Sequence, residues 1–218
     1  MEEQISVAIV GGTGNLGTAL AQRLAFPGVK VLVGSRDKEK GRAVADSLTR
    51  SLGKGTFEGA SNRDAARVAD LVVIAVPYEG HAPMLTELKA ELQDKTIVDA
   101  VVPLNKGKPF TPPAGSALLE AQSILGQETR LVGALHNISA VDLQHPGAPL
   151  GDVLVCGDHA DSKKSVIEFL GKIGAQGLDA GPASNAYVIE GLTGVLIQIN
   201  RKYKSKHASI KITGIGER

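Results

Sequence analysis

Residues 6–17 read SVAIVGGTGNLG, an apolar segment that runs directly into a glycine-rich turn. Within the turn, Gly12, Gly14 and Gly17 have the G-x-G-x-x-G spacing. In that pattern the first glycine allows a tight turn, the second lets the backbone approach a pyrophosphate, and the third lets a helix pack closely on a strand. The helix that follows presents free N–H groups and the positive end of its dipole to an anion. The stretch therefore predicts a dinucleotide-binding turn.

The sequence around this turn has the order that a βαβ unit requires. Apolar, mostly β-branched residues at 7–10 predict a buried strand. Leucines recur every four residues from Leu16 to Leu24, which gives the next helix one apolar stripe. Pro27-Gly28 ends that helix, and a second strand is predicted at 29–33. The alternative, a glycine-rich turn without a ligand, does not require this order.

The end of the second predicted strand indicates which dinucleotide is bound. An NAD site usually places Asp or Glu about 20 residues after the fingerprint, where the carboxylate binds the ribose 2′-hydroxyl. This sequence has Ser35 and Arg36 instead, with Lys40 one helical turn further on. A hydroxyl and a guanidinium bind a 2′-phosphate, which an acidic side chain would repel. We therefore expect NADP rather than NAD. Asp37 is the competing acid, and we expect it to cap the next helix.

Composition excludes several classes of function. The chain has 218 residues, 43% of them hydrophobic, and a net charge of +1, which gives no indication of a nucleic-acid or membrane partner. Aromatic residues make up only 3%, too few for stacked platforms that bind single-stranded nucleic acid. No apolar run reaches the length of about 18 residues that a membrane helix needs. The acidic start, Met1-Glu-Glu-Gln4, does not resemble a signal peptide, and the single Cys156 fits a reducing cytoplasm.

Predicted strands and helices alternate along most of the chain. Strands are predicted at 6–10, 29–33, 56–59, 70–76, 96–102, 130–136 and 153–157, and helices at 38–52, 61–68, 80–92 and 117–125, with a loop at 106–115. This alternation predicts an α/β fold of the Rossmann type, with a doubly wound, mostly parallel sheet and a small C-terminal α/β extension. We expect an NADP-binding domain at 1–157. The extension at 158–218 is expected to complete the acceptor cleft.

The extension has its own pattern. A helix at 161–173, a short strand and turn at 177–182, and a long helix at 185–203 are predicted. The long helix is expected to bury the apolar residues Val188, Ile189, Leu192, Val195, Leu196 and Ile199. Such a stripe indicates that one face of the helix is buried, but not which surface covers it. The helix therefore either covers the sheet or forms a homodimer interface. The alternating tail at 209–213 is expected to be an edge strand.

Ligands in such sheets lie beyond the carboxyl ends of the strands, so the residues at these ends are candidates for the binding site. Val76-Pro77 and Val102-Pro103 each end a strand with proline, and Tyr78 could flank a nucleotide ring. His136 is the most informative titratable residue, because histidine moves a proton near neutral pH. Its alternative role is a neutral histidine bonded to the backbone. Asp99, inside a strand, is expected to anchor a loop. The other histidines show no metal-ligand spacing.

Taken together, these motifs resemble the NADP-dependent oxidoreductases of the deazaflavin coenzyme F420. Residues 11–17 and 33–36 match the nucleotide motifs of that family, and four later segments match further signatures. Those segments are 134–136, 155–158, 162–164 and 178–182, where the last reads LDAGP. The resemblance implies direct hydride transfer between the nicotinamide and deazaflavin rings, which carry their own reactivity.

The resemblance also implies roles for individual residues. The residues expected to bind NADP are Gly12, Thr13, Gly14, Asn15, Leu16, Gly17, Ser35, Arg36, Lys40, Val76, Tyr78, Leu104 and Ala140. His136 and Ile138 are expected to line the deazaflavin pocket, and no catalytic acid or base is assigned. The chain departs from the family pattern on the acceptor side, where it has Asn137 and Ser139, and also Tyr187, Gly191 and Gly194 in place of Arg, Ser and Pro.

Three hypotheses follow from the sequence. The first is an enzyme that transfers a hydride between NADP(H) and coenzyme F420, a small redox carrier. The second is an NADPH-dependent reductase of a flavin or another small acceptor. The third is a module that senses NADP(H) without turnover. The departures at Tyr187 and Gly191 keep the second and third open.

Overall fold

The computed structural model describes residues 4–145 and 147–215, so the first three residues of the acidic start lie outside the described residues. A six-stranded sheet forms its centre, in the order β3-β2-β1-β4-β5-β8, with every pairing parallel. Its strands are β1 (Ile5–Val10), β2 (Val29–Ser35), β3 (Thr56–Ser61), β4 (Leu71–Ile74), β5 (Thr96–Asp99) and β8 (Leu131–Gly133). The chain reverses direction across the sheet between β1 and β4, where ligands bind in such folds. The predicted fold class is confirmed.

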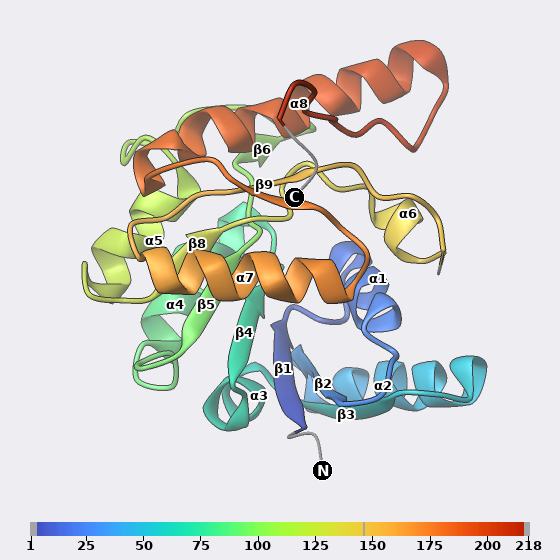
Figure 1. Cartoon of the computed structure of the whole chain (residues 1–218). Helices are drawn as coiled ribbons and strands as arrows, with labels where there is room; N and C mark the ends of the chain where they lie inside the picture. The colour runs from blue at the N-terminus through green and yellow to red at the C-terminus, as the bar shows by residue number, and fades with distance from the viewer. Residues whose placement is uncertain (1–3, 146, 216–218) are drawn as a thin grey trace.

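Helices cover both faces of this sheet (Figure 1). They are α1 (Asn15–Arg23), α2 (Lys38–Leu52), α3 (Asn62–Val68), α4 (His81–Leu88), α5 (Ala117–Leu125), α6 (Ala140–Leu143), α7 (Ala160–Lys172) and α8 (Ala186–Tyr203), with short 3-10 helices η1 (Tyr78–Gly80) and η2 (Ala183–Asn185). Successive strand residues point to opposite faces, so Val7 and Ile9 pack with α1, α2 and α7, whereas Ala8 and Val10 pack with α3, α4 and α5. The two apolar layers hold the carboxyl ends of the strands in one row.

The segment after β8 builds a smaller second sheet. Strands β9 (Val153–Val155) and β10 (Gly177–Asp179) pair in parallel, and an antiparallel bridge between Gly133 and Cys156 joins β9 to the main sheet. The strand predicted at 153–157 is thus present but shorter, and it is not a parallel strand of the main sheet. Inside the predicted loop at 106–115 lies the end of a hairpin, β6 (Leu104–Asn105) with β7 (Lys108–Pro109). Lys106 and Gly107 turn this hairpin with positive φ values of 50° and 74°.

In the C-terminal region, the expected strand at 209–213 is absent, and the apolar stripe of α8 is only partly buried within a single chain. Helix α8 buries Ile189 and Leu196, but Val188, Val195 and Ile199 are exposed. The reason is that α8 packs only one narrow stripe, including Gly194, on the β6–β7 hairpin and α5. The tail at 209–213 forms no strand. Instead it is held by polar contacts to Asp152, whose N–H donates to Ile210 O and whose carboxylate accepts from Ile212 N.

Candidate nucleotide and acceptor site

The glycine-rich turn between β1 and α1 is shaped by four glycines. Gly11 has a φ of +81°, and a Cβ at this position would lie 2.6 Å from Ala75 O. The positive φ of the turn therefore lies at Gly11, the residue before the first glycine of the G-x-G-x-x-G pattern, where a side chain would clash with Ala75 O. A Cβ at Gly17 would lie 2.6 Å from Gly11 O, so α1 packs directly on the turn. Gly14 is exposed and leaves the turn open to a ligand.

The N-terminus of α1 has free hydrogen-bond donors. Its N-cap residue, Gly14, has no side chain that could cap the helix, and Asn15 is exposed. Asp37 caps α2 and Ser61 caps α3, whereas α4, α7 and α8 resemble α1 in having no side-chain cap. The first N–H groups of a helix have no partner within it, and with the helix dipole they form an anion site. This end of α1 fits a pyrophosphate.

The end of β2 lies beside this turn. Gly12 N donates to Gly34 O at 2.8 Å, which fixes the residue before Ser35 against the glycine loop. Ser35 is buried, and its hydroxyl accepts from Asp37 N at 3.2 Å. Arg36 and Lys40 are exposed and form no ion pair with another described residue. The expectation that Asp37 caps the next helix is confirmed.

The other residues expected along the nucleotide come from four separate segments. Val76 follows β4 and touches the turn, since its Cγ1 lies 2.8 Å from a Cβ placed at Gly11. Tyr78 packs edge-on against Phe110, with ring centroids 5.3 Å apart. Leu104 begins the hairpin, and Ala140 begins α6, which packs against α1. Val76, Leu104 and Ala140 thus each follow a strand or begin an element at the carboxyl edge of the sheet.

His136 lies beyond β8 at the same edge and is almost completely buried. Its carbonyl accepts from the Thr193 hydroxyl at 2.6 Å, but neither ring nitrogen has a partner among the described residues. Burial lowers the pKa of His136 to about 4, so the ring is neutral at neutral pH. Ile138, two residues on, is partly buried against the core. A buried ring with two unsatisfied nitrogens fits a site that a polar ring of a second ligand completes.

A buried acid–base cluster next to this site was not predicted. His81, which the sequence placed apart from the other histidines, lies 2.9 Å from Asp99 through its Nε2. Asp99 also accepts from Val101 N, which confirms that it anchors a loop. Glu190 of α8 accepts from Ala117 N and Leu118 N at the start of α5. The sequence signal for this cluster was a carboxylate inside an apolar segment: Asp99 in a strand and Glu190 in a helix.

Burial and neighbouring charges set the protonation of this cluster. Burial lowers the pKa of His81, but the carboxylate of Asp99 outweighs burial and leaves that pKa raised. Burial raises the pKa of Glu190 to about 7, although two backbone N–H groups oppose it. His81 and Asp99 are sealed from solvent. The cluster therefore orders the ends of β5, α5 and α8 around the site.

Replacing Glu190 tests this assignment through stability. The pKa of Glu190 is about 7 in the folded chain against 4.5 for the free group, so the folded state holds this proton to higher pH than the unfolded state. Its contribution to the unfolding free energy should then fall by up to about 3 kcal/mol as pH rises from 4.5 to 7. Glu190→Gln should remove that fall in the unfolding free energy. Glu168→Gln, at an exposed position of α7, should leave the fall unchanged. Urea unfolding at several pH values measures both, and parallel pH profiles for wild type and Glu190→Gln would contradict the assignment.

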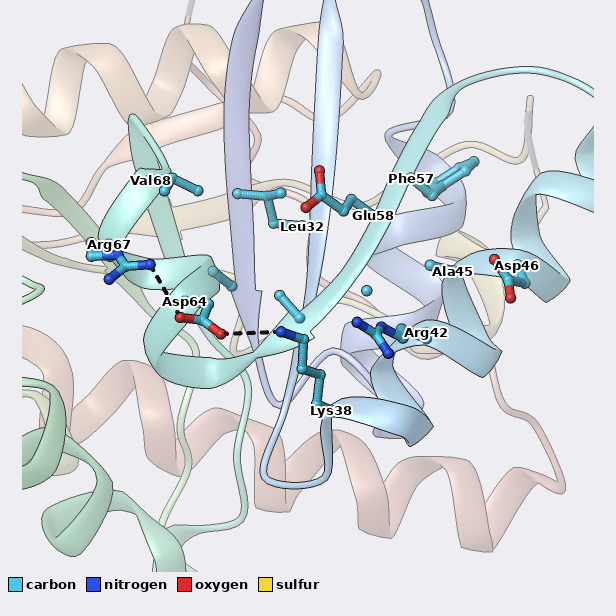
Figure 2. A pocket seen from close by; sticks show the side chains of 13 residues that line it. Leu32, Lys38, Arg42, Ala45, Asp46, Phe57, Glu58, Asp64, Arg67 and Val68 are labelled. Carbon is cyan, nitrogen blue, oxygen red and sulfur yellow. Dashed lines mark hydrogen bonds and ion pairs between the residues drawn. The ribbon is translucent and has the colours of Figure 1, made fainter.

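A separate cavity lies away from this sheet edge. It has a volume of about 600 Å³ and runs along the outer edge of β3, between α2 and α3 (Figure 2). Lys38 and Arg67 reach Asp64 there at 3.6 and 3.3 Å, so its charges are largely paired. None of the predicted site residues lines it.

Within residues 4–145 and 147–215, no group of three His, Cys, Asp or Glu side chains is placed to hold a metal ion. Over the same residues, no helix combines the length and the apolar character that crossing a bilayer would require.

Comparison with known proteins places the chain among relatives of matching length. The family model described as NADP oxidoreductase coenzyme F420-dependent matches residues 6–103. The F420-dependent NADP reductase of Methanocaldococcus jannaschii is 37% identical over 97% of this chain and 99% of its own length. The chain belongs to this family. The F420-dependent NADP reductase of Methanothermobacter thermautotrophicus is 35% identical over 98% of this chain and 97% of its own.

A solved structure from this family shares the fold over nearly the whole chain. It is an Arthrobacter protein assigned as an F420-dependent NADP reductase, with a TM-score of 0.82 and 26% identity. The alignment covers 95% of this chain and 99% of that one. The family resemblance inferred from the sequence motifs is thus confirmed, and the chain is an NADP-dependent oxidoreductase by family.

Three of the departures from the family pattern, Tyr187, Gly191 and Gly194, lie along α8. Tyr187 is 60% exposed, and a Cβ at Gly191 would meet no atom within 4 Å. At Gly194 a Cβ would lie 2.4 Å from two atoms of the Pro109 ring. The hairpin therefore packs against α8 more closely than a proline at position 194 would allow.

Proposed function

We propose that this chain catalyses hydride transfer between NADP(H) and coenzyme F420. The observation that carries the proposal is one sheet edge with two unsatisfied features: the uncapped N-terminus of α1 and the buried, unpartnered ring of His136. The first matches a pyrophosphate and the second matches a polar ring. An oxidoreductase that joins two diffusible carriers needs both sites at one edge.

The nucleotide is held by three groups of residues in this proposal. The turn residues Gly12, Thr13, Gly14, Asn15, Leu16 and Gly17 bind the pyrophosphate, and Ser35, Arg36 and Lys40 bind the 2′-phosphate. Val76, Tyr78, Leu104 and Ala140 line the path toward the nicotinamide. His136 and Ile138 contact the deazaflavin, with residues 158–218 closing the acceptor side as a small second domain. The nicotinamide and deazaflavin supply the redox chemistry.

The chain itself contributes position rather than acid–base catalysis. His136 is neutral at neutral pH, so it hydrogen-bonds without carrying a charge toward the hydride. His81 is paired with Asp99 at 2.9 Å, so neither group is free to act as an acid or base toward a ligand. Holding two rings in reactive contact removes the entropic cost of their encounter, which is a large share of the barrier.

The absorbance of the oxidised deazaflavin provides the test. Protein mixed with NADPH and oxidised coenzyme F420 should bleach that absorbance at a rate proportional to protein concentration. Bleaching of a flavin but not of F420 would favour an NADPH-dependent reductase of another acceptor. Tight NADPH binding with neither reaction would favour an NADP(H)-sensing module.

We also propose that α8 forms a homodimer interface. Tyr187, Val188, Val195, Ile199 and Tyr203 leave apolar surface exposed along this helix. Exposed apolar surface of this kind marks interaction sites. Val195→Lys with Ile199→Lys should give a monomer by light scattering, and a wild-type monomer would rule the interface out. The lone buried Cys156 fits a cytoplasmic location.

A further inference from the structure

Two segments near the proposed acceptor site carry positive charge without any acid. Residues 100–119 contain Lys106 and Lys108, and residues 191–215 contain Arg201, Lys202, Lys204, Lys206 and Lys211. None of the 23 Asp and Glu residues of the chain lies in either segment. Because the whole chain has a net charge of only +1, this concentration is local.

The fold brings the two segments together. Arg201 Nη2 lies 2.8 Å from a Cβ placed at Gly107, in the turn between the two hairpin lysines. Helix α8 packs on the same hairpin through Gly194 and Pro109. We name the resulting surface the cationic patch; its residues are Lys106, Lys108, Arg201, Lys202, Lys204 and Lys206, all exposed.

No ion pair among the described residues neutralises the cationic patch. Lys211 pairs with Asp152 and is left out of it. The six patch residues form no ion pair with any other described residue. Like charges held close together repel, so such a surface is suited to an anion that reduces the repulsion.

The patch adjoins the acceptor site. The Thr193 hydroxyl contacts the carbonyl of His136, and Arg201 lies eight residues further along α8, about 12 Å at the helical rise. The Ser139 hydroxyl donates to Lys206 O at 2.8 Å, next to Ile138. Phe110, which ends the hairpin region, packs on Tyr78. An extended anionic chain of roughly ten bonds, attached to a ring beside His136, would span this distance to Arg201.

We propose that the cationic patch binds a phosphate- and carboxylate-bearing side chain of the acceptor, outside the cleft that holds the acceptor ring. This inference rests on the proposed function. The phosphates of NADP have their own donors at α1 and at Ser35 and Arg36, so the patch is a separate anion site. It selects among deazaflavins by their side chain and leaves ring chemistry unchanged.

The experiment compares coenzyme F420 with its precursor, the deazaflavin that lacks the phosphate and carboxylates. Lys108→Gln with Arg201→Gln should raise the Kd for F420, measured by deazaflavin fluorescence on NADP-loaded protein, about tenfold at low salt. The Kd for the precursor and for NADPH should not change, and the effect on F420 should shrink at 0.5 M salt. Lys164→Gln with Lys172→Gln, on exposed α7, is the matched control.

The outcomes separate the two proposals. If wild-type protein binds and reduces both deazaflavins with equal Kd, the proposed function stands and the patch proposal is overturned. Equal loss for F420 and the precursor in the double variant would also overturn it, because the side chains would then act on the ring site. If wild type binds F420 more tightly than the precursor but reduces neither, the patch stands and hydride transfer is wrong.

Discussion

Arg36→Ala is expected to lose about 30- to 150-fold in NADPH affinity while NADH affinity changes less than threefold. Only NADPH carries a 2′-phosphate, and a charge-assisted hydrogen bond from a guanidinium contributes about 2–3 kcal/mol. Arg36 is exposed at the end of β2 beside the glycine turn and has no ion-pair partner among the described residues. Fluorescence titration with both nucleotides measures the two affinities.

Two further variants sharpen this result. Arg36→Lys should recover part of the loss, because it restores the charge but not the bidentate geometry. Arg50→Ala, at the exposed far end of α2, should leave both affinities unchanged. An equal loss for NADPH and NADH in Arg36→Ala would show that Arg36 does not contact the 2′-phosphate.

Gly17→Ala is expected to damage both the fold and the nucleotide site. Its methyl group would lie 2.6 Å from Gly11 O and 2.7 Å from Gly12 Cα, and both are backbone atoms that cannot rotate away. Overpacking of this kind costs about 1–3 kcal/mol, which lowers Tm by several degrees in a chain of this size. Because α1 must move off the turn, NADPH affinity should fall at least about tenfold. Calorimetry and nucleotide titration measure the two effects.

Gly171→Ala provides the matched control for that substitution. Gly171 is in α7, and a Cβ there would meet no atom within 4 Å. The same chemical change should therefore leave NADPH binding intact and stabilise the chain by about 0.5–1 kcal/mol through helix propensity. If Gly17→Ala behaved like Gly171→Ala, the close approach of α1 to the turn would not be required for binding.

The nucleotide half could be predicted because its determinants are local in sequence. The glycine spacing, Ser35-Arg36 and the cap at Asp37 each act within a few residues, and period and composition are sufficient to place them. Even there, the positive φ at Gly11 could not be predicted, since the close approach that requires glycine comes from Ala75, just after β4. Asn62, whose Oδ1 accepts from Gly11 N, was missed for the same reason.

The acceptor half depends on contacts between distant segments, which no local pattern records. His81, Asp99 and Glu190 are brought together from α4, β5 and α8. The apolar residues of α8 were all expected to be buried because periodicity reports a stripe but not its width. The tail was expected to be a strand from its alternation, but Asp152 takes its backbone groups instead.

The contacts of the C-terminal tail also determine the order in which parts of the chain can fold during synthesis. Ser139 and Asp142 of the α6 region, and Asp152 before β9, are held by residues 206–212 through contacts that include His207 to Asp142 and Lys211 to Asp152. Those partners leave the ribosome dozens of residues later than the loop they fasten. A nascent chain can therefore complete its nucleotide half while translation continues. The binding surface for the acceptor is complete only after the tail has emerged. An incomplete chain that binds NADP(H) would therefore not yet transfer a hydride to the acceptor.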